Sequence, residues 1–316
     1  MSLAAAVLER PGRVCPADYS YAPNVFARPA DFSAEVLYVV GGLYGNLPAL
    51  AAIERMATAE PAPVTVVFNG DFYWFDAEPG WFAGIEDGVA AHRALRGNVE
   101  TEIARAADIG AGCGCAYPEG VAEDVVVRSN DILSQLRDAA PAPARARLAR
   151  LPMHLVAGVG GLRVGIVHGD AAALAGWRFA REELDDPARR NWLADVHSAA
   201  QVDVFASTHT CAAALRDFVT PRGRLTVINN GAAGMPNFAD TAFGVVTRIA
   251  ALPSPQQPLY GCVRGGVHID ALAVDYDHTA FLDRFLRRWP EGSPAFASYY
   301  QRIVNGPHDS IAQARP

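Results

Sequence analysis

The stretch V-T-V-V-F-N-G-D-F-Y-W-F-D occupies residues 64–76 and decides the expected fold. Val64–Phe68 is a run of β-branched and aromatic residues without a charge, which predicts a buried strand. The run ends abruptly at Asn69, Gly70 and Asp71. Ligands bind at the carboxyl ends of strands in α/β sheets, so Asp71 stands where a functional carboxylate is expected. An isolated Gly-Asp pair more often caps a turn, and the choice therefore depends on partners elsewhere in the chain.

The composition excludes several classes of protein. The 316 residues are 51% hydrophobic, which is enough for one large core or two modest ones. The formal net charge of −7 gives no basic face, so neither nucleic acid nor anionic lipid is an expected partner. The five cysteines are scattered and odd in number, which indicates a reducing compartment rather than a disulfide framework.

The ends of the chain and its apolar regions predict one cytoplasmic domain over residues 1–316. The N-terminus reaches Glu9 too early for the apolar core of a signal peptide. The longest apolar region, residues 36–53, is broken by polar, glycine and proline positions, so no membrane partner is expected. Within the domain, we expect an irregular lead-in over residues 1–34 and a C-terminal helical addition over residues 278–316.

The hydrophobic pattern predicts alternating strands and helices. A strand at 36–40, a glycine turn and a helix at 47–59 precede the strand at 64–68, which makes a βαβ unit. Asn46 suits the N-cap of this helix and Pro48 its first turn. Further helices are expected at 81–96, 131–150 and 280–289. Further strands are expected at 153–157, 162–167, 202–206, 225–228, 243–249 and 267–274.

Four polar residues directly follow predicted strands or sit in glycine turns: Asp71, Asn98, His168 and His209. One carboxylate, one amide oxygen and two imidazoles are a suitable ligand set for Mn²⁺, Fe²⁺ or Zn²⁺. Each residue alone is more often structural, as a turn former or a backbone-bonded histidine. Four of them on one edge of a sheet together predict a metal site.

With these residues in place, the chain resembles the calcineurin-like metallophosphoesterases. That family shows D-x-H, G-D, G-N-H, a strand that ends in H, and G-H-x-H, often followed by N-P-G-S. The order and spacing of the motifs match from about residue 36 to residue 250. The corresponding segments are G-L-Y (42–44) followed by G-N-L-P-A-L, G-D (70–71), R-G-N-V-E (96–100), V-H-G-D (167–170), T-H-T-C (208–211) and N-N-G-A-A-G (229–234).

The resemblance implies a fold and a metal content. The expected fold is a four-layer α/β sandwich with two mixed β-sheets flanked by helices. Asp71, Asn98, His168 and His209 match the complete ligand set of one metal, so we expect one divalent ion, Mn²⁺, Fe²⁺ or Zn²⁺. The private ligands of the family's other metal fall on Gly42, Tyr44 and Cys211. A second metal would therefore have only the thiolate of Cys211 and the phenolate of Tyr44.

The resemblance also implies hydrolase activity, but one catalytic group of the family is absent. The histidine of G-N-H is Val99 here, and its loss removes general acid catalysis worth about 10²–10⁴-fold. One hypothesis is a metal-dependent phosphoric ester hydrolase that cleaves a phosphomonoester or phosphodiester, with a small phosphorylated substrate or nucleotide as its partner. Its catalytic residues would be Asp71, Asn98 and Tyr44, with Tyr44 either donating a hydrogen bond to phosphate or filling the space of the missing metal. The alternative is a non-catalytic relative that binds a phosphate-bearing ligand or a protein.

Other residues carry weaker signals. Cys113 and Cys115 have no partner pair at zinc spacing, which favours a loop with two reduced thiols over a metal knuckle. The aromatic run 73–75, with Trp81, suits either a substrate mouth or the core. The glycines of 229–234 allow close backbone approach, and the resemblance gives Asn230 a role in orienting ligands. The remaining open question is whether Asp76 or Asp170 rebuilds the second metal position.

Overall fold

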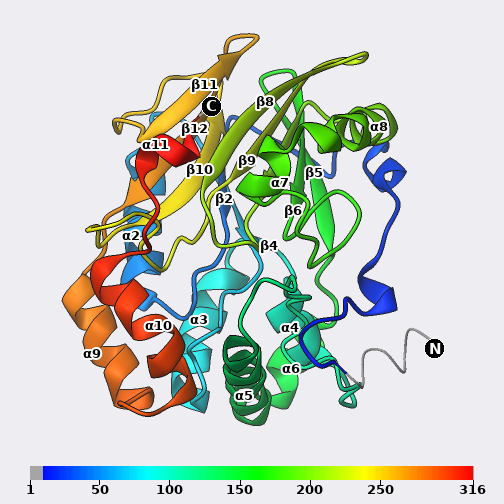
Figure 1. Cartoon of the computed structure of the whole chain (residues 1–316). Coiled ribbons are helices and arrows are strands. Elements are labelled where there is room, and N and C mark those ends of the chain that lie inside the picture. The colour runs from blue at the N-terminus through cyan, green and yellow to red at the C-terminus, as the bar shows by residue number, and fades with distance from the viewer. Residues whose placement is uncertain (1–9, 316) are drawn as a thin grey trace.

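The computed structural model describes residues 10–315, in which two mixed six-stranded sheets lie face to face (Figure 1). The first sheet has the order β1 (Phe32–Ala34), β5 (His154–Val159), β6 (Leu162–Val167), β7 (Val204–Ser207), β9 (Gly223–Asn229), β8 (Ala214–Thr220). The second has the order β11 (Tyr260–Arg264), β12 (Val267–Val274), β10 (Gly244–Ala250), β2 (Val36–Val40), β3 (Val64–Asn69), β4 (Arg93–Leu95).

Helices cover the outer faces of both sheets (Figure 1). The α-helices are α2 (Leu47–Thr58), α3 (Pro79–Ala90), α4 (Asn98–Ala104), α5 (Glu123–Ala139), α6 (Ala142–Leu148), α7 (Arg181–Asp185), α8 (Arg190–Ala200), α9 (His278–Arg288), α10 (Pro294–Asn305) and α11 (Ile311–Ala314). Three short 3₁₀ helices are η1 (Ala17–Tyr19), η2 (Pro23–Phe26) and η3 (Pro187–Arg189). No helix among residues 10–315 is long and apolar enough to cross a membrane.

Alternation along the strands builds three separate hydrophobic layers. In β2, Leu37 and Val39 join the cluster between the sheets, whereas Tyr38 and Val40 join the cluster under α2 and α3. In β7, Phe205 faces the other way from its neighbours and packs with the buried face of α8. Because successive side chains of a strand point to opposite faces, buried strands of this kind need a layer on each side. The four-layer sandwich predicted from the sequence is confirmed.

Most predicted elements are present, with two corrections. The helix predicted at 81–96 ends at Ala90, and Arg93–Leu95 pairs with β3 as the edge strand β4. The helix predicted at 131–150 begins earlier, at Glu123, and breaks into α5 and α6. Ala140 is extended there because the proline that follows it disfavours the helical conformation. Part of the lead-in is regular, since β1 pairs with β5; its first nine residues lie outside the described part of the chain.

The two sheets are tied together where their parallel strands end. Parallel pairing aligns β3 with β2 and β4 in one sheet, and β7 with β6 and β9 in the other. At the end of β3, the Asn69 amide donates across to the carbonyl of Val167 at 2.7 Å. The amide of Asn230 donates to the carbonyls of Gly41 (3.0 Å) and Val245 (2.8 Å). Asn230 thus fastens the two sheets and bonds no predicted ligand.

Candidate metal centre

The structure brings the four predicted ligands together. Asp71, His168 and His209 follow the ends of β3, β6 and β7, and Asn98 is the first residue of α4. The Nε2 atom of His168 lies 3.0 Å from Asn98 Oδ1, 3.1 Å from His209 Nδ1 and 3.4 Å from Asp71 Oδ2. Ligand atoms of Asp71, His168 and His209 all lie within 4.8 Å of one another. All four side chains are buried.

Hydrogen bonds on the far side of each ring fix which atoms face the cluster. His168 Nδ1 is 2.8 Å from the carbonyl of Asn69, and His209 Nε2 is 3.0 Å from the carbonyl of Cys115. A carbonyl only accepts, so each of these nitrogens carries the hydrogen and the opposite nitrogen of the neutral ring presents a lone pair. The Asn98 amide nitrogen donates to the carbonyl of Cys113 at 2.9 Å, which turns its Oδ1 inward.

The cluster therefore consists of four acceptors that face each other without a donor. Two nitrogen lone pairs, an amide oxygen and a carboxylate oxygen at these distances repel unless a cation lies among them. Two nitrogen and two oxygen donors suit Mn²⁺, Fe²⁺ or Zn²⁺. The outer hydrogen bonds to backbone carbonyls are those that metal-binding histidines ordinarily make. The residues present fit a divalent metal ion.

Without a metal, a proton is the cation that the cluster can hold. Burial lowers the pKa of His168, but the Asp71 carboxylate outweighs burial and raises that pKa above its usual value. Burial raises the pKa of Asp71, and His168 in turn holds it below the ordinary range. Burial and the neighbouring His168 lower the pKa of His209 to about 3. When no metal is bound, His168 is therefore the group of the cluster that takes up a proton most readily.

We expect metal affinity to rise with pH through a midpoint above 6.5, because the proton must leave His168 before Nε2 can coordinate. The raised folded-state pKa stabilises the metal-free protein below the unfolded pKa of about 6.5, and this stabilisation is lost as pH rises through the folded value. Calorimetric titration with Mn²⁺ in buffers of different ionisation enthalpy should detect the release of more than about half a proton per ion at pH 6.5. Metal binding without proton release at that pH would contradict the assignment.

Glycines give the ligands room to approach. Gly70 has φ +78° and Asp71 has φ 54°, so two successive residues adopt the left-handed region. A Cβ atom on Gly70 would lie 2.5 Å from the backbone nitrogen of Gly97. A Cβ atom on Gly97 would lie 2.5 Å from Asp71 Oδ1. The Asp71 turn can therefore meet the start of α4 only with glycine at both positions.

Glu100 is a fully buried carboxylate beside the cluster that was not among the predicted site residues. Its oxygens accept the backbone N–H groups of Asp71 (2.8 Å), Phe72 (3.0 Å) and Gly97 (2.9 Å). Burial and the Asp71 charge raise the pKa of Glu100 to about 7. Glu100 therefore clamps the Asp71 turn onto α4. Its place three residues after the helix cap is a recognisable signal, since an acid there commonly accepts the N-cap N–H.

The residues that match the private ligands of the family's other metal are Gly42, Tyr44 and Cys211, and none of the three carries a charge. The Tyr44 hydroxyl lies 2.6 Å from Cys211 Sγ, and the tyrosine ring lies 3.0 Å from where a Cβ of Gly42 would stand. Burial raises the pKa of Tyr44 well above its usual value and also raises the pKa of Cys211. Tyr44 thus stays a phenol and occupies the space beside Gly42.

Neither carboxylate considered as a replacement ligand joins the cluster. Asp76 pairs with Arg284 at 3.0 Å. Asp170 accepts the backbone N–H groups of residues 172, 173 and 178, which shapes the loop after His168. Both acids therefore have structural partners.

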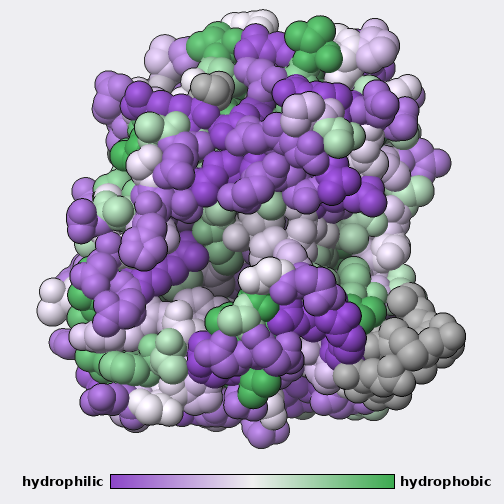
Figure 2. Space-filling view, viewed as in Figure 1, coloured by the Kyte–Doolittle hydropathy of each residue, from purple (hydrophilic) through white to green (hydrophobic). Residues whose placement is uncertain are grey.

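A pocket of about 200 Å³ opens onto the cluster. Its lining includes Asp71, Asn98, Val99 and His209, and also Tyr44 and Cys211. Aromatic residues and one arginine complete the wall: Trp74, Tyr117, Trp177, Tyr299 and Arg302. Figure 2 shows this face of the molecule hollowed near its centre, with weakly polar and hydrophobic residues inside a hydrophilic rim.

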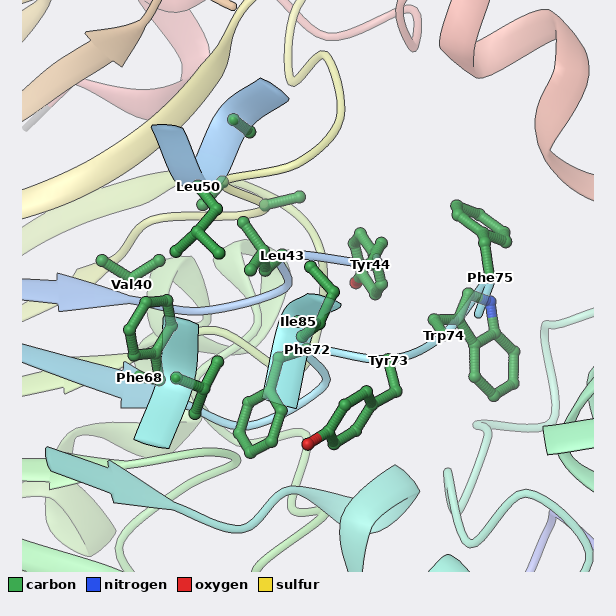
Figure 3. Close-up of a cluster of buried hydrophobic side chains, with 14 of the residues drawn as sticks. Val40, Leu43, Tyr44, Leu50, Phe68, Phe72, Tyr73, Trp74, Phe75 and Ile85 are labelled. Atoms are coloured by element: carbon green, nitrogen blue, oxygen red, sulfur yellow. The ribbon is translucent and has the colours of Figure 1, made fainter. Parts of the chain in front are cut away.

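Figure 3 shows Tyr73, Trp74 and Phe75 within a cluster of buried hydrophobic side chains, and of these three only Trp74 also lines the pocket. Tyr73 stacks on Phe82 with ring centroids 3.8 Å apart, and Phe75 packs against Phe285. Trp81 lies under the Arg284 guanidinium and lines no part of the pocket.

The loop with Cys113 and Cys115 supports the site. Both thiols are free. The carbonyl of Cys113 accepts from Asn98, and the carbonyl of Cys115 accepts from His209 and from the indole of Trp177 (2.9 Å). The loop therefore orients two of the four ligand residues through its backbone, a role that residue types alone do not reveal.

The two stacked mixed sheets, with the acidic and imidazole cluster at their strand ends, define the class: the chain has the fold of the calcineurin-like metallophosphoesterases. It is similar to the crystal structure of a metallophosphoesterase from Sphaerobacter thermophilus, with 15% sequence identity, a TM-score of 0.53, and coverage of 86% of this chain and 100% of that one. It is also similar to a hypothetical protein from Pyrococcus horikoshii OT3, with 18% identity, a TM-score of 0.58, and coverage of 87% and 99%. At such identities the likeness shows the fold alone. No family model and no curated protein matches the sequence.

Proposed function

We propose that the chain is a one-metal phosphoesterase that hydrolyses a phosphomonoester or phosphodiester in the pocket above Asp71, Asn98, His168 and His209. The observation that carries the proposal is that Asn98 Oδ1, His209 Nδ1 and Asp71 Oδ2 lie 3.0–3.4 Å from His168 Nε2. Asn98, His209 and Asp71 also line the pocket. A divalent ion there would lower the pKa of a bound water and polarise a phosphoryl oxygen.

The chain's own residues would perform the remaining tasks. Asp71 and Asn98 belong to the cluster and also line the pocket. Tyr44, which stays protonated, can donate a hydrogen bond to a phosphate oxygen when the Cys211 thiol donates to it in turn. Val99 offers no proton to a leaving group, so esters with acidic leaving groups should react fastest.

A second candidate function is binding without hydrolysis. It is favoured by Tyr44 and Cys211, whose contact closes the position next to the cluster, and by the apolar Val99. Under this alternative the pocket would hold a phosphate-bearing ligand or a partner protein.

Metal content and turnover, measured on one preparation, decide between these candidates. Protein purified without chelator should contain about one divalent ion per chain by plasma mass spectrometry. With added Mn²⁺ it should hydrolyse bis-p-nitrophenyl phosphate or p-nitrophenyl phosphate, and dialysis against chelator should abolish this turnover. Metal without turnover would favour the binding function, and neither metal nor turnover would overturn the proposal.

A further inference from the structure

Arg302 brings a positive charge to the pocket from helix α10. Its Nε donates to the carbonyl of Pro236 (3.3 Å) and one terminal nitrogen donates to the carbonyl of Cys211 (2.9 Å). A guanidinium has five N–H donors, so three of them stay available. Arg302 forms no ion pair with any carboxylate among residues 10–315. It is also the one arginine or lysine in the described lining of this pocket.

Such a guanidinium is suited to a phosphate. The carbonyls of Pro236 and Cys211 hold the guanidinium in place. Cys211 comes two residues after His209, so the second bond ties Arg302 to the loop that carries this predicted ligand. Charge-assisted bonds from arginine to phosphate are short, can be bidentate, and are about twice as strong as neutral ones. Because the side chain of Arg302 is already held in place, less side-chain conformational entropy is lost when a ligand binds.

Two aromatic pairs form a rigid wall around the same pocket. Trp74 meets Tyr299 edge to face at 6.3 Å, and Tyr117 meets Trp177 at 5.9 Å. The Trp177 indole is bonded to Cys115 O, and its ring lies 5.2 Å from that of His209. Wide, fixed aromatic faces of this kind favour a flat apolar group.

We propose, on the basis of the proposed function of this pocket, that its ligand is an aryl phosphomonoester. Arg302 binds the phosphate beside the metal cluster, and the wall of Trp74, Tyr117, Trp177 and Tyr299 holds one aromatic ring. The volume of about 200 Å³ is below the roughly 300–1,000 Å³ of pockets for drug-sized ligands. It suits a single ring better than a dinucleotide or a polymer.

Binding of phosphonates that cannot be hydrolysed tests the proposal without turnover. Calorimetry on the Mn²⁺-loaded protein should give phenylphosphonate about 10-fold tighter binding than butylphosphonate, because the ring gains aromatic contacts. Arg302→Ala should weaken both by about 10- to 100-fold. Arg302→Lys keeps the positive charge but cannot make the bidentate contacts of a guanidinium, so it should recover part of the lost affinity.

Two further variants distinguish the contribution of the aromatic wall to binding from that of Arg302. Trp177→Leu keeps an apolar side chain but removes the aromatic ring. It should weaken the binding of phenylphosphonate and not that of butylphosphonate, so the two affinities become similar. Arg287→Ala changes an exposed arginine of α9 and should change neither affinity. Equal affinities of the wild-type protein for both probes, or unchanged affinities in both Arg302 variants, would overturn the proposal.

The proposed hydrolase function fails independently of this one. If phenylphosphonate is preferred but no phosphate ester is hydrolysed, the aryl phosphate site stands and the hydrolase proposal falls. If esters are hydrolysed without any preference for an aryl group, the aryl phosphate site falls and the hydrolase proposal stands.

Discussion

A His209→Ala variant is expected to fold and to lose its tightly bound metal. The substitution removes one of four ligand atoms at the cluster, while His168, Asp71 and Asn98 keep their own hydrogen bonds to backbone groups. Loss of an outer partner of a metal ligand alone typically lowers affinity by about 10- to 100-fold, so loss of a ligand should exceed that. Metal content after purification without chelator is the measurement, with a circular dichroism melting curve to confirm folding.

His197→Ala is the matched control for this experiment. His197 is also a buried histidine, but it lies on α8 and bonds the Thr220 hydroxyl, away from the pocket. The control should keep its metal. A His209→Ala protein that retains one ion per chain would show that the ligand assignment is wrong.

Glu100→Ala should destabilise the protein and the metal site together. It leaves the N–H groups of Asp71, Phe72 and Gly97 buried without an acceptor, and each such group costs about 1–3 kcal/mol. The free energy of unfolding should therefore fall by about 3 kcal/mol or more. Urea titration measures this change, and the metal affinity of the folded protein should fall by about 10- to 100-fold.

Glu119→Ala controls for the loss of a carboxylate as such. Glu119 forms an exposed ion pair with Arg10. Its removal should measurably change neither the free energy of unfolding nor the metal affinity. If Glu100→Ala were as stable as this control, the three hydrogen bonds would not hold the Asp71 turn.

The metal cluster is the part of the site that the sequence could predict. Asp71, His168 and His209 each follow an apolar strand, and parallel strands deliver their ends to one sheet edge. The apolar runs Val36–Val40 and Val64–Phe68 likewise predicted the two strands of a βαβ unit, whereas the layered sandwich was predicted from the family resemblance. Short-range pattern is sufficient where position along a strand determines position in space.

The rest of the pocket depends on packing between distant segments. Trp177, Tyr299 and Arg302 reach it from loops and from a helix that carry no motif, and α10 is placed by its contacts with α5 and α9. Neither the hydrophobic periodicity of a helix nor the residues of its flanking turns predict which of its faces will line a pocket. Edge strands such as β8 and β11 were missed because their alternation is short and interrupted by arginine, aspartate or glycine.

The placement of α10 also bears on the order in which the pocket can form during synthesis. Residues 71 to 211 supply the cluster and most of the wall, whereas Arg302 follows Cys211 by 91 positions. At about 5–20 residues per second, a ribosome needs on the order of 5–20 s to make the intervening chain. During that interval the strands β9, β10 and β12, which complete the two sheets, are made before the arginine. A phosphorylated ligand can be held by the complete set of contacts only after α10 has left the ribosome and docked.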